Sequence, residues 1–361
     1  MKILQVINNL YTGGAEKLIL DTIPLYRKQG IEMDLAVLQD GDFPFMKALE
    51  ETQSCKIYKI GKRSVYSPLL ILPLAKIMKN YDIIHVHLFP AQYFAVIANQ
   101  INGNSSKLIF TEHNTSNRRI RNKIFKPLEI FIYSRYQKII CITEEIKNII
   151  NKYVNVPEER LPVIENGVDL NKIYKAESKE KSEIHSSLTH EDVLITQVSA
   201  FRLQKDQPTV IRAMQLLPQN YKLFLVGDGK QRKNCEDLVK KLNLEKRVFF
   251  LGERNDVPKL LKSSDFIVLS SHFEGLSLSS IEGMASGKPF IASDVPGLKE
   301  IVNGYGKLFP LGDEKALAEI ILKLEKDSSL YQSVAKKCQE RAENFSLDKM
   351  LTQYLNLYYS L

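Results

Sequence analysis

Residues 265–294 read DFIVLSSHFEGLSLSSIEGMASGKPFIASD. Two short apolar runs, 265–270 and 289–293, enclose a loop of glycine and serines and a segment of helical composition. An apolar run, a small-residue loop, a helix and a second apolar run form the strand–helix–strand unit of a parallel sheet. This stretch therefore predicts an α/β fold.

The same alternation extends along most of the chain. Short apolar, β-branched runs are separated by helix-compatible segments, and strands that are apolar on both faces predict parallel sheets covered by helices on both sides. The polar stretch 171–192 separates two series of runs. Two doubly wound domains are therefore favoured over a TIM barrel, which needs eight evenly spaced units. The predicted strands are 2–7, 33–38, 82–88, 107–111, 138–143 and 161–165, then 193–199, 221–227, 247–252, 265–270 and 289–293.

The length of 361 residues agrees with two domains. We place the boundary near residues 165–170, which gives an N-terminal Rossmann-like domain over 1–165 and a C-terminal one over 166–345. Residues 346–361 carry apolar and aromatic side chains at helical spacing, which predicts a final helix that packs against another element.

The composition excludes several classes of protein. Hydrophobic residues make up 44% and charged residues 25% of the chain, unlike a disordered protein. No apolar run approaches the roughly 20 residues that cross a bilayer. Met1 and Lys2 lead directly into a strand-like run, so we expect no export signal and a cytoplasmic protein.

Two acids stand out in the opening stretch. Glu274 falls in the loop and Glu282, eight positions later, falls about one turn into the predicted helix, so both carboxylates can face one ligand. The backbone N–H groups at a helix start are unpaired and favour phosphate or hydroxyl oxygens. On spacing alone, the alternative is a helix start with two solvated acids.

This segment resembles the donor-site motif E-x7-E of family 4 (group 1) of the GT-B-fold glycosyltransferases. The resemblance covers most of the chain and nearly all of its second half. Its other matching segments are GGAEK (13–17), TEHN (111–114), VIENGVD (163–169), QKDQPTVIRAM (204–214), LFLVGDG (223–229), VFFLGERNDVPKLLKSSDFIVLSS (248–271) and GKPFIASDVPGLKEIV (287–302).

The resemblance implies a fold and an activity. The GT-B fold has two Rossmann-like domains that face each other across a cleft, with the acceptor on the N-terminal domain, the nucleotide-sugar on the C-terminal domain and a final helix that returns to the N-terminal domain. The family implies a hexosyltransferase-type enzyme that moves a sugar from a UDP- or GDP-linked donor to a glycan or lipid-linked acceptor with retention of configuration. Bacterial surface polysaccharide is the expected product, and no obligatory metal or other cofactor is expected.

The family's site residues transfer to matching positions. Glu282 would hold the ribose, Glu274 would contact the transferred sugar, and Lys205 would neutralise the diphosphate, where a fixed cation stabilises the charge of the leaving group. The expected catalytic residues are His113, Glu274, Lys205 and Arg202. The expected donor-binding residues are Gly13, Gly14, Arg202, Lys205, Gly227, Arg254, Gly275, Leu276, Ser277 and Glu282.

The arginine that partners the lysine is a departure from the family. The family places it five residues before the lysine, where this chain has Ala200, and Arg202 stands three before it. Our interpretation is that Arg202 reaches the phosphates from a shifted position. The alternative is that Arg202 only pairs with a nearby acid such as Asp206.

In the N-terminal half, Gly13 and Gly14 follow the first strand and resemble the family's loop beside the donor phosphates. Alone, the pair would indicate only a turn, because the dinucleotide pattern G-x-G-x-x-G is absent. His113 follows a strand end, where α/β proteins bind ligands, and by resemblance lies near the sugar. His85 and His87 share one strand face, but without a third ligand nearby we interpret them as structural or site-lining.

Asp40 and Asp42 form a D-x-D triplet, which binds a metal–diphosphate in the other large glycosyltransferase fold. Its position after the second strand favours a surface turn, and we predict no metal site there.

Residues 114–138 combine seven lysines and arginines with one acid and several interleaved aromatic and apolar residues. Such a stretch can lie on an anionic membrane surface, so we expect peripheral contact with the inner face of the cell membrane. A solvated basic face over ordinary core residues fits equally well. Nucleic acid is not an expected partner, because no recognised binding motif accompanies the charge.

Three other functions fit part of the sequence. A GT-B sugar-nucleotide epimerase or hydrolase would use the same nucleotide pocket. A catalytically inactive partner subunit would agree with Ala200. An NAD-dependent oxidoreductase would agree with the two α/β halves but lacks the dinucleotide glycine pattern.

Overall fold

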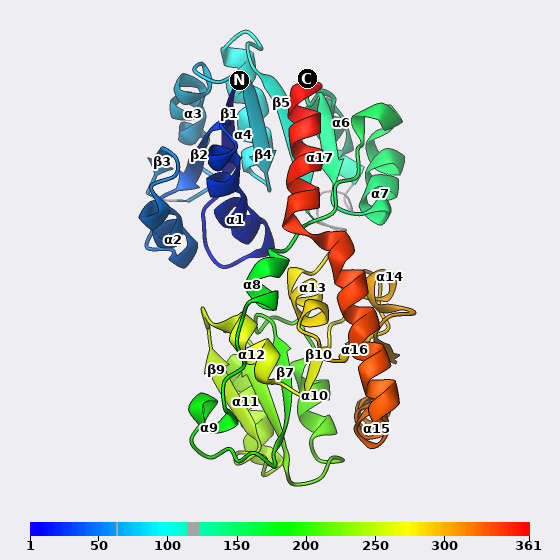
Figure 1. Ribbon diagram of the computed structural model, residues 1–361. Helices are drawn as coiled ribbons and strands as arrows, with labels where there is room; N and C mark the ends of the chain where they lie inside the picture. Colours follow the sequence, from blue (N-terminus) through cyan, green and yellow to red (C-terminus); the bar gives the residue numbers. More distant parts are fainter. Residues whose placement is uncertain (63, 114–122) are drawn as a thin grey trace. The chain divides into compact units, whose positions relative to one another are not determined.

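The structure is a computed structural model that describes residues 1–62, 64–113 and 123–361 (Figure 1). The chain forms two compact units. The first unit is Met1–Gly167 together with Leu347–Leu361, and the second unit is Val168–Ser346. Within the described residues, each unit holds one six-stranded sheet whose strand pairs are all parallel, which confirms the predicted doubly wound α/β fold.

The sheet of the first unit has the strand order β3-β2-β1-β4-β5-β6. Its strands are β1 (Lys2–Ile7), β2 (Glu32–Gln39), β3 (Ile57–Gly61), β4 (Ile83–His87), β5 (Lys107–Glu112) and β6 (Lys138–Cys141). Its helices are α1 (Gly14–Lys28), α2 (Pro44–Thr52), η1 (Pro68–Leu70), α3 (Ile71–Met78), α4 (Ala91–Ile101), η2 (Lys123–Phe125), α6 (Lys126–Ser134), α7 (Glu144–Val154), η3 (Glu158–Arg160) and α17 (Leu347–Tyr359).

The helices of the first unit form two layers. The order of the sheet runs outward from β1 in one direction and from β4 in the other, so right-handed crossovers place α1 and α4 on opposite faces. Helices α3, α4 and α6 pack in series on one face, and α17 packs beside α1 on the other. The buried side of α17 consists of Leu347, Met350, Leu351, Tyr354 and Tyr358.

The sheet of the second unit has the order β12-β11-β10-β7-β8-β9. Its strands are β7 (Val193–Val198), β8 (Tyr221–Val226), β9 (Val248–Gly252), β10 (Phe266–Leu269), β11 (Phe290–Ser293) and β12 (Lys307–Phe309). Its helices are α8 (Leu170–Tyr174), α9 (Lys181–Ile184), α10 (Gln207–Ala213), α11 (Arg232–Lys241), α12 (Val257–Ser263), α13 (Leu278–Ala285), α14 (Lys299–Val302), α15 (Glu314–Lys326), α16 (Ser328–Ala342) and η4 (Glu343–Phe345).

Individual strand predictions were wrong at three places. Residues 161–165 form no strand, because they touch the edge strand β6 only through the isolated bridge between Cys141 and Val163, beside a proline that has no N–H to donate. Strands β3 and β12 were missed. Strand β3 is half-buried at the sheet edge and carries Lys59, and β12 has only three residues, so neither shows an apolar run.

Two loops at the ends of neighbouring strands approach closely in the second unit. The N–H of Ser199 donates to the carbonyl of Val226 at 2.9 Å, and the N–H of Gly227 donates to the carbonyl of Gly252 at 2.8 Å. A Cβ on Gly227 would overlap the carbonyl oxygen of Ser199, and this glycine has a φ of +129°. Glycine at 227 therefore allows the segment after β7, which carries Ala200, Arg202 and Lys205, to lie against the end of β8.

We predict that Gly227→Ala destabilises the protein more than Gly304→Ala does. Gly304 also has a positive φ, +84°, but no atom lies within 4 Å of the position of its Cβ. Gly304→Ala should cost only the backbone strain, about 1–2 kcal/mol, whereas Gly227→Ala adds an overlap with backbone worth about 1–3 kcal/mol more. Urea denaturation measures both losses, and equal losses would contradict the close approach.

Candidate functional site

Two loops of the second unit pair like short antiparallel strands. The N–H of Asp206 donates to the carbonyl of Ser270 at 3.0 Å, and the N–H of His272 donates to the carbonyl of Gln204 at 2.8 Å. Between these bonds, Lys205 forms a bridge with Ser271. The loop before α10 is thereby fixed to the loop after β10, so Lys205 lies beside the first acid of the motif.

Lys205 and Glu274 form an ion pair across these loops. The ammonium group of Lys205 donates to Oε1 of Glu274, and the hydroxyl of Ser271 donates to the same oxygen at 2.5 Å. The side chains are 13% and 6% exposed, so the pair is largely removed from water. A buried charge is tolerated when it is paired and hydrogen-bonded, as here.

The segment after Glu274 presents a row of backbone donors. Helix α13 begins at Leu278, and Ser277 precedes it in extended conformation without a side-chain cap. Within the described residues, no backbone carbonyl accepts a hydrogen bond from the N–H groups of residues 275–279. Five consecutive N–H groups at the positive end of a helix form a site that suits an anion.

Two glycines fix the position of this segment. A Cβ on Gly283 would lie 2.7 Å from the ring of Phe290 and 2.9 Å from Ile267, so α13 can lie close to β10 and β11 only with glycine there. Glu282, the neighbouring residue, is half-buried on this helix. Gly297 has a φ of +85°, and its Cβ would overlap the carbonyl oxygen of Glu274. The backbone around both acids is therefore held by close packing.

Arg202 stands apart from this cluster. Its side chain is exposed, and its guanidinium group makes no hydrogen bond or ion pair with the residues that the structure describes. Asp206, its alternative partner, instead accepts from the hydroxyl of Ser270 at 3.1 Å and from the N–H of Thr209 at 3.4 Å. The alternative pairing of Arg202 with Asp206 is thus not observed.

The first unit carries the remaining predicted residues at the carboxyl ends of its strands. Gly13 precedes α1, and its Cβ would overlap the carboxylate of Glu16, so that side chain folds back over the glycine turn. His113 follows β5, and its Nε2 lies 3.1 Å from Nδ1 of His87 on β4. His85, on the same strand, lies in hydrogen-bond range of Thr111 and Tyr358, both at 2.7 Å.

These three histidines are neutral at pH 7. Burial lowers the pKa of His85 to about 3 and that of His113 to about 4. Burial, and to a lesser extent the neighbouring His85, hold the pKa of His87 well below its usual value. A cluster of this kind can accept or relay hydrogen bonds but carries no positive charge.

Comparison with known proteins identifies the family. Residues 12–172 match the model described as Glycosyltransferase Family 4, and residues 178–344 match the model described as Glycosyl transferases group 1. An uncharacterized glycosyltransferase of Methanocaldococcus jannaschii is 31% identical over 84% of this chain and 79% of its own length. The chain is a group 1 glycosyltransferase. It is a hexosyltransferase-type enzyme, as the sequence resemblance implied.

Relatives with named activities support the same assignment. N-acetyl-alpha-D-glucosaminyl L-malate synthase of Bacillus anthracis is 28% identical over 84% of this glycosyltransferase and 82% of its own length. The structure of HepE from Anabaena in complex with UDP-glucose superimposes with a TM-score of 0.88 at 24% identity over all of both chains. This likeness concerns the fold, and confirms that the glycosyltransferase has the GT-B fold.

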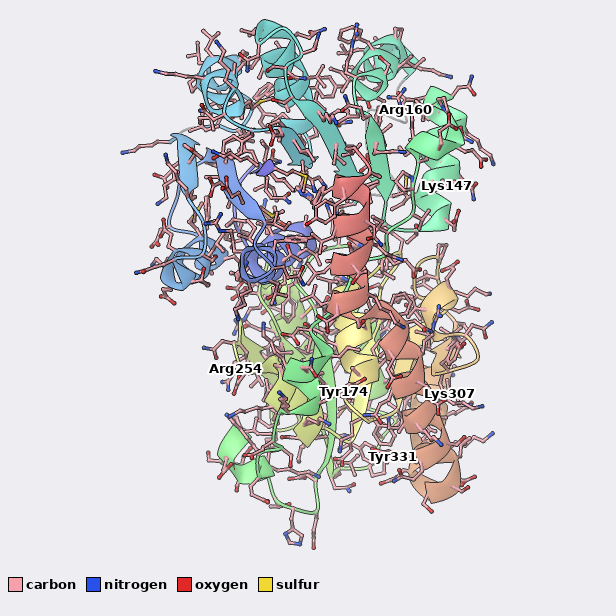
Figure 2. The ribbon with its side chains drawn as sticks, turned by 45° about the horizontal axis from the view of Figure 1, so that its top comes forward. Lys147, Arg160, Tyr174, Arg254, Lys307 and Tyr331 are labelled. Atoms are coloured by element: carbon pink, nitrogen blue, oxygen red, sulfur yellow. The ribbon has the colours of Figure 1, made fainter. Side chains whose placement is uncertain are left out.

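Two predicted donor residues have structural roles in this glycosyltransferase. Gly227 permits the contact with Ser199 described above. Arg254, which is labelled in Figure 2, binds both carboxylate oxygens of Asp256 at 2.8 Å, and Lys179 binds the same carboxylate at 2.8 Å. These hydrogen bonds hold the pKa of Asp256 well below its ordinary value. In this conformation the guanidinium of Arg254 is therefore engaged by a carboxylate.

The D-x-D triplet lies in the loop after β2. Asp40 pairs with Lys59 at 3.4 Å and Asp42 with Lys47 at 2.6 Å. Across residues 1–62, 64–113 and 123–361, no group of three or more histidine, cysteine or acidic side chains is arranged to hold a metal ion. Among the described helices, none has both the length and the apolar character needed to cross a bilayer.

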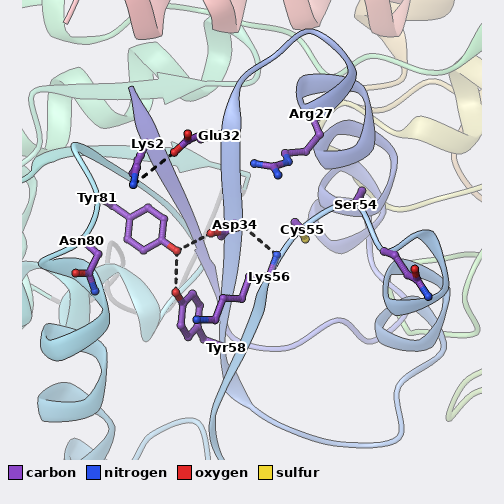
Figure 3. Close-up of a pocket in the computed structure, with 11 residues that line it drawn as sticks. Lys2, Arg27, Glu32, Asp34, Ser54, Cys55, Lys56, Tyr58, Asn80 and Tyr81 are labelled. Atoms are coloured by element: carbon purple, nitrogen blue, oxygen red, sulfur yellow. Dashed lines mark hydrogen bonds and ion pairs between the residues drawn. The ribbon is translucent and has the colours of Figure 1, made fainter.

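A hollow of about 660 Å³ lies at the opposite edge of the first sheet, where β1, β2 and β3 begin (Figure 3). Asp34 accepts from the hydroxyl of Tyr81 at 2.7 Å and from the N–H of Lys56 at 2.9 Å, and Lys2 pairs with Glu32 at 3.6 Å. These polar groups bind one another. Ligands of α/β sheets bind at the carboxyl ends of strands, so this hollow is not a candidate active site.

Sequence reasoning missed several residues that surround Glu274 in the second unit and the histidines in the first. Ser271, Gln204 and Gly297 support Glu274, and Gln5 and Tyr358 contact the histidines. Ser271 and Gly297 fall within the matched motifs, so their nearness to Glu274 was a usable signal. Gln5 and Tyr358 lie 353 positions apart, and nothing in the local sequence connects them.

We predict that the ion pair behaves as a coupled unit. Lys205→Met would leave the buried carboxylate of Glu274 without its cation, at a cost of roughly 3 kcal/mol in the free energy of unfolding. Combining it with Glu274→Gln removes both charges and should recover much of that loss. The measurement is urea denaturation of the wild type, both single variants and the double variant.

The exposed pair of Lys299 and Asp294, at 3.1 Å, provides the control. Lys299→Met should cost less than about 1 kcal/mol. Additive losses at Lys205 and Glu274, or a loss at Lys205 no larger than at Lys299, would contradict the coupling.

Proposed function

We propose that this glycosyltransferase transfers a sugar from a nucleotide diphosphate-sugar. The observation that carries the proposal is the Lys205–Glu274 ion pair beside the unpaired N–H groups of residues 275–279. An ammonium group and a helix start supply positive charge for a diphosphate, and a carboxylate next to them supplies acceptors for sugar hydroxyls.

The roles within this site follow from its chemistry. The N–H groups near Gly275, Leu276 and Ser277 approach the phosphates and sugar, and Lys205 stabilises the charge that grows on the leaving diphosphate. Glu274 binds the transferred sugar and Glu282 binds the ribose. Arg202, exposed and three residues before Lys205, adds a second cation when the phosphates are bound.

The names of similar proteins suggest the donor and the acceptor. HepE was crystallised with UDP and with UDP-glucose. One Escherichia coli relative is named as a UDP-Gal:alpha-D-GlcNAc-diphosphoundecaprenol galactosyltransferase, and one from Campylobacter jejuni acts on a diphospho-undecaprenol glycan. We propose a UDP-linked sugar, with a GDP-linked one as the alternative, and a lipid-linked glycan acceptor in bacterial surface polysaccharide synthesis.

The proposed reaction retains anomeric configuration. The acceptor oxygen forms a bond to the anomeric carbon on the face from which the diphosphate leaves, and the proton of the acceptor hydroxyl passes to a phosphate oxygen. Lys205 and the helix N–H groups stabilise the departing charge, a role that a metal ion fills in other transferases. Gly13, Gly14 and His113 of the first unit contact the substrates. Gly227 and Arg254 make secondary contacts with the nucleotide-sugar.

We predict that Glu282→Ala abolishes binding of UDP-sugar and UDP in calorimetry, because the ribose loses its carboxylate partner. Lys205→Ala should retain donor binding but lower kcat by about 100-fold, the effect of removing one group that stabilises the transition state. Lys240→Ala removes an exposed lysine from α11 and should behave as the wild type. Wild-type turnover by the Glu282 and Lys205 variants would refute these roles.

The same assays separate the alternatives. Consumption of donor without acceptor, with release of a new free sugar, would indicate an epimerase or hydrolase. Failure of the wild type to bind any nucleotide diphosphate or its sugar conjugate would indicate an inactive partner subunit.

We further propose that the layer of α3, α4 and α6 contacts an anionic membrane. Large apolar side chains are exposed on this layer, and exposed Lys126 begins α6 while exposed Arg135 directly follows it. Residues 114–122, with three of the arginines of the predicted basic stretch, lie outside the described residues. The exposed apolar residues are Leu69, Leu72, Ile97, Ile101, Ile124, Phe125, Leu128, Ile130 and Phe131. Exposed apolar side chains with basic neighbours suit a lipid headgroup region.

We predict that Ile124→Glu with Leu128→Glu weakens sedimentation with vesicles of anionic phospholipid by at least about tenfold, because carboxylates are repelled by the anionic surface. Leu311→Glu, at an exposed apolar residue of the second unit, is the control and should sediment like the wild type. Unchanged sedimentation of the double variant, or loss of a dimer instead, would contradict membrane contact.

A further inference from the structure

A buried polar network joins three neighbouring strands and the last helix of the first unit. Part of it lines a small cavity bounded by β1, β4, α1, α17 and His113, which follows β5. The polar members are Gln5, His85, His87, Thr111, His113, Tyr354 and Tyr358. Only His113 had a predicted role in the reaction, so the other members remain to be explained.

One branch of the network runs from Gln5 to His113. The Oε1 atom of Gln5 lies 2.8 Å from Nε2 of His87, and Nδ1 of His87 lies 3.1 Å from Nε2 of His113. Each contact needs one donor and one acceptor. A neutral imidazole has one N–H and one bare nitrogen, so the direction of the first bond determines the direction of the second.

The thioether of Met33 determines that direction. The Nε2 atom of Gln5 lies 3.5 Å from the sulfur of Met33 and 3.3 Å from the hydroxyl of Tyr358. A thioether sulfur can accept a hydrogen bond but cannot donate one. Turning the amide over would set its oxygen against the sulfur, with no hydrogen between them. The amide nitrogen therefore faces Met33, and the amide oxygen faces His87.

We infer that Gln5 and His87 are positioning residues that fix the tautomer of His113. Because Oε1 of Gln5 accepts, Nε2 of His87 carries the proton and its Nδ1 is bare. That bare nitrogen accepts from Nε2–H of His113, which leaves Nδ1 of His113 as a hydrogen-bond acceptor. Within the described residues, Nδ1 of His113 has no hydrogen-bond partner.

This tautomer limits what His113 can bind, an argument that rests on the proposed function. A bare imidazole nitrogen accepts from a hydroxyl and repels a phosphate oxygen. His113 therefore serves the sugar or acceptor hydroxyls, and Lys205 serves the diphosphate. Gln5 and His87 act through His113 and touch no reactant themselves.

The tautomer can be measured without any substrate. In the full chain labelled with 15N-histidine, long-range 1H–15N correlation distinguishes protonated from bare ring nitrogens, and His→Gln substitution assigns each of the six histidines. We expect a protonated Nε2 and a bare Nδ1 at both His87 and His113. A protonated Nδ1 at His113 in the wild type would overturn the inference.

Variants at Gln5 test whether this residue fixes the tautomer of His113. Gln5→Leu removes the acceptor and should let His113 populate both tautomers, whereas Gln5→Glu keeps an oxygen at that place and should preserve the wild-type pattern. Tyr358→Phe removes the hydroxyl that contacts Nε2 of Gln5 and Nδ1 of His85 but leaves the contact between Oε1 of Gln5 and His87, so His113 should be unchanged. An unaltered His113 spectrum in Gln5→Leu would overturn the inference. If Gln5→Leu does not fold, the spectra of the wild type and of Gln5→Glu still decide it.

Kinetics provide the link to the reaction. A histidine in the wrong tautomer lowers the rate of the chemical step while the geometry of binding is unchanged. Gln5→Leu should therefore lower kcat about tenfold or more with little change in KM for the donor. Gln5→Glu should restore most of the lost kcat. A change in tautomer without any change in kcat would overturn the link to the reaction. A complete lack of transferase activity in the wild type would refute the proposed function and leave the tautomer result intact.

Discussion

The ion pair of Lys205 and Glu274 depends on a backbone constraint: two loops from neighbouring strands are hydrogen-bonded to each other on both sides of Lys205. Burying two charges is costly, and the cost is offset only if the pair is held in place and its remaining lone pairs are satisfied. Ser271 satisfies one of these lone pairs, and Gly297 brings a neighbouring turn against the carbonyl of Glu274. The cation is therefore in position before any anion arrives, which is the preorganisation that electrostatic catalysis requires.

The two units carry different chemistry. The second unit presents a cation, two carboxylates and a row of unpaired N–H groups. The first unit presents neutral imidazoles, whose charge is suppressed by burial in a network anchored by Gln5 and the last helix. In the proposed reaction, the second unit therefore binds the phosphates, the ribose and the transferred sugar, and the neutral imidazoles of the first unit bind hydroxyls alone. In the second unit, the charged groups and the N–H groups lie within short segments of the sequence. In the first unit, the hydrogen-bond network is made of residues that are far apart in the chain.

That difference explains what sequence reasoning could predict. Strand–helix alternation predicted both sheets, and a motif within 30 residues predicted a loop at Glu274 followed by a helix that contains Glu282, because local spacing determines that geometry. Lys205 came from family resemblance. The edge strands β3 and β12 were missed because edge strands bury less apolar surface and lack a continuous run. The Gln5–His87–His113 branch and its contact with Tyr358 exist only after folding brings β1, β4, β5 and α17 together.

The central claim is that Lys205 and the N–H groups at the start of α13 bind a diphosphate. A crystal structure of the wild-type enzyme with a bound nucleotide diphosphate-sugar tests it most directly. The account predicts phosphate oxygens within hydrogen-bond distance of Nζ of Lys205 and of at least two N–H groups among residues 275–279, with the sugar against Glu274. A diphosphate bound elsewhere, with the ion pair of Lys205 and Glu274 unchanged and those N–H groups facing water, would contradict it.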